Sequence, residues 1–421
     1  MPVSQANYEK FLNFRPLNVL QCFGNEGIAL VSGRDICNAM KQSNAIAMAA
    51  NIRNPLSAAG ILRAAKKMDS AVILELAKSE NTYCGVHFDN LPIMALEYSR
   101  NIGHGAVFAL HMDHYAIKSD SDRDQACSFI PQAISLGWTS VAVDASHNDD
   151  FRNLIYTRDV AMHIPAYISL EVEVGEIRGA GVLSTVEEAE YFIGGLNSWS
   201  IFPDYLAISN GSKHGAYDRS SGEDEGIDLN RTLEIADAIE KYGVVIAQHG
   251  ISGTPLDKVG KFKNSKIHKG NVGTLWQTIL FGSKIDDTGN PVIENGSYIK
   301  DSGRGISDEL WEKIVKWADG KGMSRKSGDY KKSNIVFLDE IMKLEKKYID
   351  RIVDETEEWA MKFFKAFNSE GTASLVIENI LKRADHNCAP YRKIIAKRED
   401  FSAQKAPDFK KDESQSGNFE D

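Results

Sequence analysis

The sequence predicts an α/β fold, a (β/α)8 barrel with an inserted loop region and extra C-terminal helices. Eight short apolar runs occur before residue 282, and most are nearly continuous in Val, Ile, Leu and Ala. Continuous runs are typical of parallel strands that are buried on both faces. Helical patterns lie between the runs, which favours a closed barrel, with an open doubly wound sheet as the alternative. The predicted strands are residues 45–50, 71–76, 106–110, 140–144, 167–173, 205–209, 244–248 and 266–270.

The segments between these runs carry helix-start signals. Residues 57–67 are rich in Ala and Leu and follow Asn54-Pro55, a capping residue with proline at the first helical position. Residues 184–196 open with Ser-Thr-Val-Glu-Glu, which resembles a capping box. Two further helices are predicted at residues 122–136 and 229–242, each between two successive strands.

Composition divides the chain into four predicted regions. Residues 1–282 form the barrel with an N-terminal extension, and residues 283–333, rich in Gly, Asp, Lys and Ser, form an inserted loop or lid with one helix at 308–317. Residues 334–402 form a helical extension, in which 335–367 is one long amphipathic helix and 374–383 is a short one. The polar residues 403–421 are predicted to be disordered.

Charge and cysteine usage exclude several classes of protein. The chain has 49 Lys and Arg against 59 Asp and Glu, a net charge of -10, which disfavours nucleic acid as a partner. No apolar stretch is long enough to span a bilayer, and the first 18 residues lack the apolar core of a secretory signal. Five scattered cysteines without a C-x-x-C spacing argue against disulfides or a thiolate metal site. We therefore expect a cytoplasmic protein without a membrane partner.

Histidines and carboxylates gather where the predicted strands end. In a barrel, these ends converge on one mouth that holds the active site. Imidazoles converging there indicate a metal, and three neutral histidines on zinc leave its full charge available to polarise a carbonyl oxygen. The polar residues at or just after the strand ends are His111, Asp113, His114, Asp144, His147, Glu171, Glu173, His214, His249 and Asn271.

Glycine turns on the last strands indicate a phosphate site. His-Gly at 214–215, His-Gly-Ile-Ser at 249–252 and Asn-Val-Gly-Thr at 271–274 place backbone N–H groups beside small hydroxyls. No G-x-G-x-x-G motif follows the first strand, which argues against a dinucleotide site.

Five motifs resemble the class II, zinc-dependent fructose-1,6-bisphosphate aldolases, in the same order and spacing. They are Leu-His-Met-Asp-His (110–114), Thr-Ser-Val-Ala-Val-Asp-Ala-Ser-His (139–147), Leu-Glu-Val-Glu-Val-Gly (170–175), Lys-His-Gly-Ala-Tyr (213–217) and His-Gly-Ile-Ser-Gly (249–253). The resemblance extends over about residues 45–280, the whole predicted barrel. It implies reversible cleavage of fructose 1,6-bisphosphate into dihydroxyacetone phosphate and glyceraldehyde 3-phosphate by a homo-oligomer.

The resemblance also implies residue roles. His114, His214 and His249 would hold zinc, and Asp113 would exchange the proton of the substrate C4 hydroxyl. Asp144 and Glu173 would hold a second divalent or a monovalent cation, while His111 and His147 would be supporting or structural residues. The substrate, including its near phosphate, would contact Asn51, Gly215, Gly250, Ser252, Asn271, Gly273 and Thr274.

Several positions depart from the family pattern. Many family members have a long loop that carries a catalytic glutamate, and this chain has only a short segment that begins at Glu176 in its place. Ala77 stands where the family has a serine. Asp218-Arg219 replaces a lysine, and the arginine for the far phosphate cannot be placed. Two alternatives follow: another ketose phosphate such as tagatose 1,6-bisphosphate, and a non-catalytic barrel subunit of a partner enzyme. Lys213 offers a third, Schiff-base chemistry as in class I aldolases, which also use barrels, but the neighbouring histidine pattern argues against it.

Overall fold

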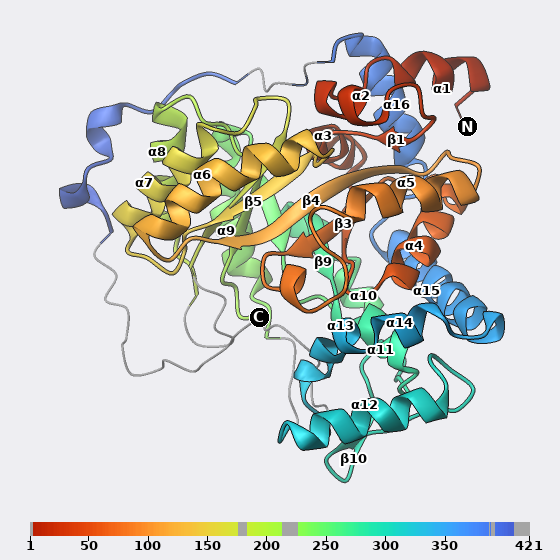
Figure 1. Cartoon of the computed structure of the whole chain (residues 1–421). Coiled ribbons are helices and arrows are strands. Elements are labelled where there is room, and N and C mark those ends of the chain that lie inside the picture. Colours follow the sequence, from red (N-terminus) through yellow and green to blue (C-terminus); the bar gives the residue numbers. More distant parts are fainter. Residues whose placement is uncertain (1–2, 176–182, 213–225, 387, 389–391, 408–421) are drawn as a thin grey trace.

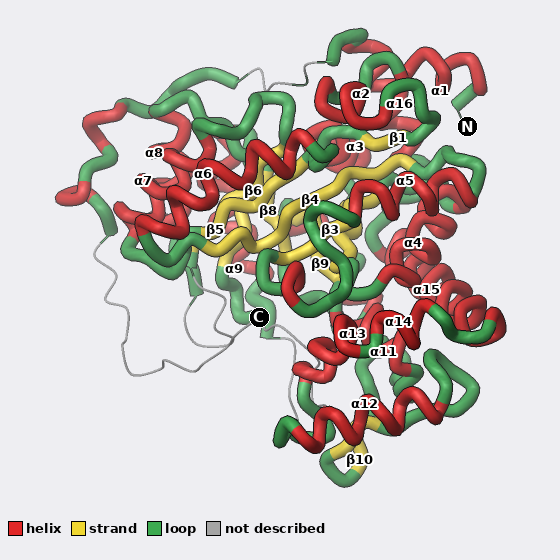
Figure 2. Tube along the Cα trace, viewed as in Figure 1, coloured by secondary structure: helices red, strands yellow, loops and turns green. Residues whose placement is uncertain are grey.

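Eight parallel strands close into a barrel in the computed structural model, which describes residues 3–175, 183–212, 226–386, 388 and 392–407 (Figure 2). Each strand pairs with its neighbour in sequence, and the last strand pairs back with the first. The predicted barrel is therefore confirmed, and the open sheet is excluded. The barrel strands are β2 (Ala47–Asn51), β3 (Val72–Ala77), β4 (Val107–Ala116), β5 (Ser140–Asp144), β6 (Ser169–Val174), β7 (Tyr205–Ile208), β8 (Val245–Gln248) and β9 (Ile267–Val272).

Helices connect the strands, and the predicted start signals act as expected. The side chain of Asn54 accepts a hydrogen bond from the Ser57 amide, 3.0 Å away, directly before Pro55. Thr185 and Glu188 form a reciprocal capping box. The helices are α4 (Pro55–Lys67), α5 (Leu91–Asn101), α6 (Asp120–Ser135), α7 (Asp150–Ala161), α8 (Val186–Ser198), α9 (Leu229–Ile239), α10 (Leu256–Val259) and α11 (Thr274–Phe281).

Elements from both ends of the chain close the N-terminal end of the barrel (Figure 1). A short strand, β1 (Ala29–Leu30), pairs in parallel with the start of β4. Apolar side chains of three helices pack against small inward residues such as Ala47, Ala49 and Ala109. This apolar floor keeps water from the barrel interior on that side. The helices involved are α1 (Gln5–Leu12), α3 (Gly33–Ser43) and α16 (Thr372–Arg383), with α2 (Leu17–Phe23) beside them.

The long C-terminal helix α15 (Lys346–Ala366) packs along α4, whereas one helix was predicted over 335–367. That prediction is wrong in its first third, which forms two short helical turns instead. The amide of Asn334 there donates to the side chain of Gln277 and to the backbone of Arg53, so contacts with the barrel outweigh helical propensity. The turns are α13 (Ser333–Val336) and α14 (Leu338–Met342).

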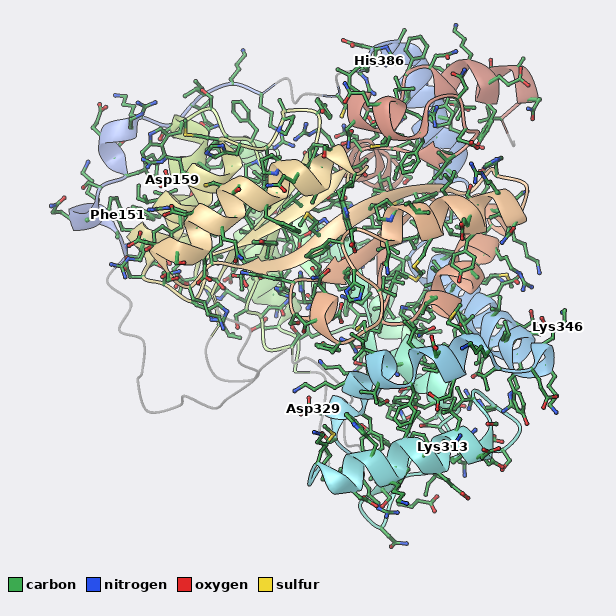
Figure 3. The ribbon with its side chains drawn as sticks, viewed as in Figure 1. Phe151, Asp159, Lys313, Asp329, Lys346 and His386 are labelled. Carbon is green, nitrogen blue, oxygen red and sulfur yellow. The ribbon has the colours of Figure 1, made fainter. Side chains whose placement is uncertain are left out.

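The segment between α11 and these turns contains a small hairpin and one helix. The hairpin joins β10 (Ile293–Glu294) to β11 (Ser297–Tyr298), and the helix is α12 (Asp308–Gly320), longer than predicted. Lys313 on α12 and Lys346 at the start of α15 are half-exposed and largely exposed, respectively, on the outside of the molecule (Figure 3). No helix among the described residues is long and apolar enough to cross a membrane. Residues 408–421, most of the predicted disordered tail, lie outside the described residues.

Candidate active site

A bulge in strand β4 positions the two residues at the centre of the site. The sequence predicted that residues 111–114 follow the strand; this is wrong, because β4 continues to Ala116. Its register with β5 shifts between Met112 and Tyr115, so two residues of β4 lie opposite one of β5. The bulge turns both Asp113 and His114 toward the interior and holds His114 at a φ of 41°, in the left-handed region.

His114 and His249 face each other at the barrel mouth, with His114 Nε2 2.7 Å from His249 Nδ1. The opposite nitrogen of each ring is held by a carboxylate. His114 Nδ1 lies 2.9 Å from Glu173 Oε1, and His249 Nε2 lies 3.0 Å from Glu171 Oε1. A carboxylate on one ring nitrogen fixes the tautomer that presents the other nitrogen to a metal. Ligand atoms of Asp113, His114 and His249 lie within 4.8 Å of one another, so all three reach one ion.

Two amides hold the Asp113 carboxylate. Asn51 Nδ2 donates to Oδ2 over 3.1 Å, and Asn271 Nδ2 donates to Oδ1 over 3.3 Å. Burial works to raise the pKa of Asp113, but nearby positive charge, first from His114 and then from Lys269, holds the pKa well below its usual range. Asp113 is therefore an ionised base. The side-chain oxygen Oδ1 of Asn271 is buried without a hydrogen-bond partner among the described residues, as expected of a group that contacts a ligand.

Asp144 and Glu173, the predicted second cation site, lie on the other side of His114. Together with His114 they form a second group whose ligand atoms are within 4.8 Å. Burial and the neighbouring Asp144 raise the pKa of Glu173 to about 8. Asp144 in turn accepts hydrogen bonds from the amide and hydroxyl of Ser146. The raised pKa of Glu173 favours a proton on this carboxyl group in the metal-free protein, and a bound cation would displace it.

A buried ionic layer lies directly below these residues, and two of its members, Glu75 and Lys269, were not predicted from the sequence. Lys269 Nζ is 2.8 Å from Glu171 Oε2 and 3.2 Å from Glu75 Oε2, and all three side chains are fully buried. Burial works to raise the pKa of Glu171, but Lys269 and the His249 hydrogen bond lower it to about 2. His111 completes the layer, with Nδ1 2.7 Å from Ser140 Oγ. The period-two alternation of strands β3, β6 and β9 was the signal that could have found the layer.

The described members of the predicted phosphate-binding set, Gly250, Ser252, Gly273 and Thr274, lie where β8 and β9 end. The Gly273 amide donates to Ser252 Oγ over 3.2 Å, and Thr274 begins α11. Gly250 has a φ of 69°, a conformation that favours glycine. His214, Gly215, Lys213, Glu176 and Asp218-Arg219 lie outside the described residues, so the predictions for them stay predictions.

Comparison with known proteins agrees with this geometry. The sequence profile of the family described as fructose-bisphosphate aldolase class-II matches residues 31–372. The chain belongs to the class II fructose-bisphosphate aldolase family. A fructose-bisphosphate aldolase of Giardia intestinalis is 28% identical over 216 residues, which are 49% of this chain and 60% of that protein. The match thus spans less than two thirds of the Giardia protein. A fructose-bisphosphate aldolase of Thermus caldophilus is 28% identical over 240 residues, which cover 56% and 72% of the two chains.

Solved structures share the fold. The YdjI aldolase from Escherichia coli K12 superimposes with a TM-score of 0.53 at 17% identity, covering 82% of this chain and 99% of that one. The fructose-bisphosphate aldolase of Campylobacter jejuni gives a TM-score of 0.53 at 16% identity, covering 85% and 99%. Both support the barrel architecture.

Class II aldolases are zinc-dependent, and the described residues fit that metal. Two imidazole nitrogens that face each other, with a carboxylate on the other nitrogen of each ring, suit a catalytic zinc. His114 and His249 would hold the ion, and the cluster around Asp144 and Glu173 could hold another cation.

Proposed function

We propose that this chain is a metal-dependent aldolase that reversibly cleaves fructose 1,6-bisphosphate into dihydroxyacetone phosphate and glyceraldehyde 3-phosphate. The observation that carries the proposal is the ionised Asp113, fixed by Asn51 and Asn271 beside the facing pair His114 and His249. We propose His114, His214 and His249 as the zinc ligands. Asp144 and Glu173 are the proposed site of a second divalent or a monovalent cation.

Asp113 would act as the general base. Its two amide donors orient the carboxylate, and the nearby charges of His114 and Lys269 favour its ionised form. It can therefore take the proton of the C4 hydroxyl while the C3–C4 bond breaks. The zinc ion, when bound, supplies a positive charge that polarises the ketose carbonyl. Asn271 would contact the substrate through its side-chain oxygen Oδ1, which has no partner among the described residues. Gly215, Gly250, Ser252, Gly273 and Thr274 would hold the near phosphate at the ends of the last strands.

A second ketose phosphate, such as tagatose 1,6-bisphosphate, is the other candidate substrate. The backbone amide of Ala77, where related enzymes have a serine, donates to the buried carboxylate of Glu80 over 3.0 Å. Ala77 lacks the hydroxyl of that serine, so the mouth of the barrel is lined differently at the end of β3. We also propose a cytoplasmic location and a homo-oligomer of two or more chains.

A coupled assay of the zinc-loaded protein with both bisphosphates, with and without chelator, tests the proposal. We expect chelator-sensitive cleavage of fructose 1,6-bisphosphate. His114→Ala should lose bound zinc and activity, whereas His163→Ala, at an exposed histidine outside the site, should keep both. Faster cleavage of tagatose 1,6-bisphosphate would favour the other substrate. Zinc binding without cleavage of either would favour a non-catalytic subunit.

A further inference from the structure

Arg53 and Glu80 form a buried ion pair at the barrel mouth that no role assigned so far explains. Arg53 follows β2 by two residues, and Glu80 follows β3 by three. Arg53 Nε lies 2.5 Å from Glu80 Oε1, with the Arg53 side chain 16% exposed and that of Glu80 2% exposed. The two strand ends that carry the pair also carry Asn51, which contacts Asp113.

Glu80 fixes the direction in which Arg53 points. Its second carboxylate oxygen accepts hydrogen bonds from the Ala77 amide, over 3.0 Å, and from Asn51 Nδ2, over 3.3 Å. Hydrogen bonds to the ends of both β2 and β3 therefore fix this carboxylate independently of its contact with Arg53. A guanidinium that is held through Nε retains its planar fork of terminal N–H groups in a defined orientation.

The terminal nitrogens of Arg53 have no protein acceptor among the described residues. The bond from Nε to Glu80 is the only hydrogen bond of this side chain in the described part of the chain. Four N–H donors therefore remain available on a partly exposed cation. Such a fork matches the geometry of a phosphate or carboxylate that accepts two parallel hydrogen bonds.

The guanidinium of Arg53 lies against Gly273, on the side where any other residue would carry its Cβ atom. A Cβ atom at this glycine would lie 3.2 Å from Arg53 Nη2 and 3.0 Å from Asn51 Oδ1. Its φ is -125°, which any residue adopts, so glycine is needed here for the close approach. On its other side, the Gly273 amide contacts Ser252 Oγ. Arg53, Ser252 and the first turn of α11 therefore all lie next to Gly273.

We propose that Arg53, presented by Glu80, is a cationic ligand for the near phosphate of the substrate. This inference rests on the proposed function, because that function places the phosphate at Ser252, Gly273 and Thr274. The chain has a net charge of -10 and the site contains several carboxylates, so a dianionic phosphate needs a local positive partner. Arg53 supplies that charge, and its fork gives the phosphate a fixed orientation.

The deciding experiment is a titration of the metal-free protein with inorganic phosphate, in which binding is measured by 31P NMR. We expect Arg53→Gln to weaken phosphate binding roughly 10- to 100-fold, and Arg53→Lys to have an intermediate effect because it keeps the charge without the fork. Arg100→Gln is the matched control, since Arg100 also pairs with one glutamate, Glu26, but lies exposed on α5. Equal phosphate affinity in the wild type and Arg53→Gln, or no binding to the wild type, would overturn the inference.

A second measurement separates phosphate binding from a merely structural role. Exchange of the C3 hydrogen of dihydroxyacetone phosphate in D2O is followed by proton NMR and compared with exchange of dihydroxyacetone. Arg53→Gln should raise KM for the phosphorylated ketose about 10-fold or more and leave the unphosphorylated ketose unaffected. An equal loss for both would mean that Arg53 acts only through Glu80 and Asn51. If the wild type exchanges neither ketose, the proposed function fails, while the phosphate titration still decides the role of Arg53.

Discussion

The lower and upper parts of the barrel interior are built from the same strands but carry opposite chemistry. On β3 and β4, inward positions near the floor are Ile73, Val107 and Ala109, which pack against the helices that close the barrel. Two residues further along the same faces lie Glu75 and His111, both fully buried. The apolar floor keeps water away from the charged layer, which makes each unpaired charge there costly. The continuous apolar pattern of the strands therefore forms the barrel, and the charged residues that interrupt this pattern form the site.

Asp113→Ala removes the proposed general base from the upper part of the barrel and has the largest expected effect, a loss of reaction rate. Loss of a general base typically lowers the rate by about 10²- to 10⁴-fold. Because His114 and His249 remain held by Glu173 and Glu171, zinc content should stay near that of the wild type. Steady-state kinetics and metal analysis check both points, and cleavage at the wild-type rate would show that the assigned role is wrong.

Lys269→Met tests whether the ionic layer depends on its one lysine. Removing one partner of a buried ion pair typically costs about 3–5 kcal/mol of unfolding free energy. Lys313→Met, on the outer face of α12, is the control and should change stability by less than about 0.5 kcal/mol. Chemical denaturation measures both variants. Adding Glu75→Gln to Lys269→Met should recover part of the loss, and equal stability of the two single variants would contradict the paired-layer description.

Ala109→Leu tests the comparison from the apolar side. Ala109 is fully buried in the floor cluster, so the added methyl groups overpack it and should cost about 1–3 kcal/mol of unfolding free energy. Its register partner on β3 is the apolar Ile73, so the activity per folded molecule should not change. Leu110→Met is the control on the same strand, because Leu110 belongs to the cluster outside the floor and the change conserves volume. A lower kcat in Ala109→Leu with unchanged stability would show that the two parts are coupled.

The sequence predicted the barrel strands better than the arrangement of the charged residues inside the barrel. All eight strand positions were found, most of them because nearly continuous Val, Ile, Leu and Ala runs report burial on both faces, whereas the run at residues 266–270 is polar. The bulge that turns Asp113 and His114 inward together was not predicted, since it arises from pairing between strands that are distant in the sequence. Lys269 was missed for a similar reason: its charge is balanced by Glu75 and Glu171 from two other strands. The break before α15 depends on Asn334 contacting the barrel, which helical periodicity cannot indicate.

His111 gives the charged layer a pH dependence whose size per pH unit is the smallest of the expected effects. Burial and the nearby Lys269 lower the pKa of His111 from 6.5 to about 3. The folded protein therefore keeps His111 neutral while the unfolded chain takes up a proton, so its contribution to stability is complete above pH 6.5 and is lost as the pH falls toward 3.

One proton corresponds to a slope of about 1.4 kcal/mol per pH unit within that window. Other groups titrate in the same window, so the measurement is the difference between the wild type and His111→Gln in urea unfolding of the metal-free protein. That difference should shrink between pH 6.5 and 5, before the carboxylates protonate. Parallel pH profiles of the two proteins would show that His111 is not held neutral and that the apolar floor does not isolate the layer above it from solvent.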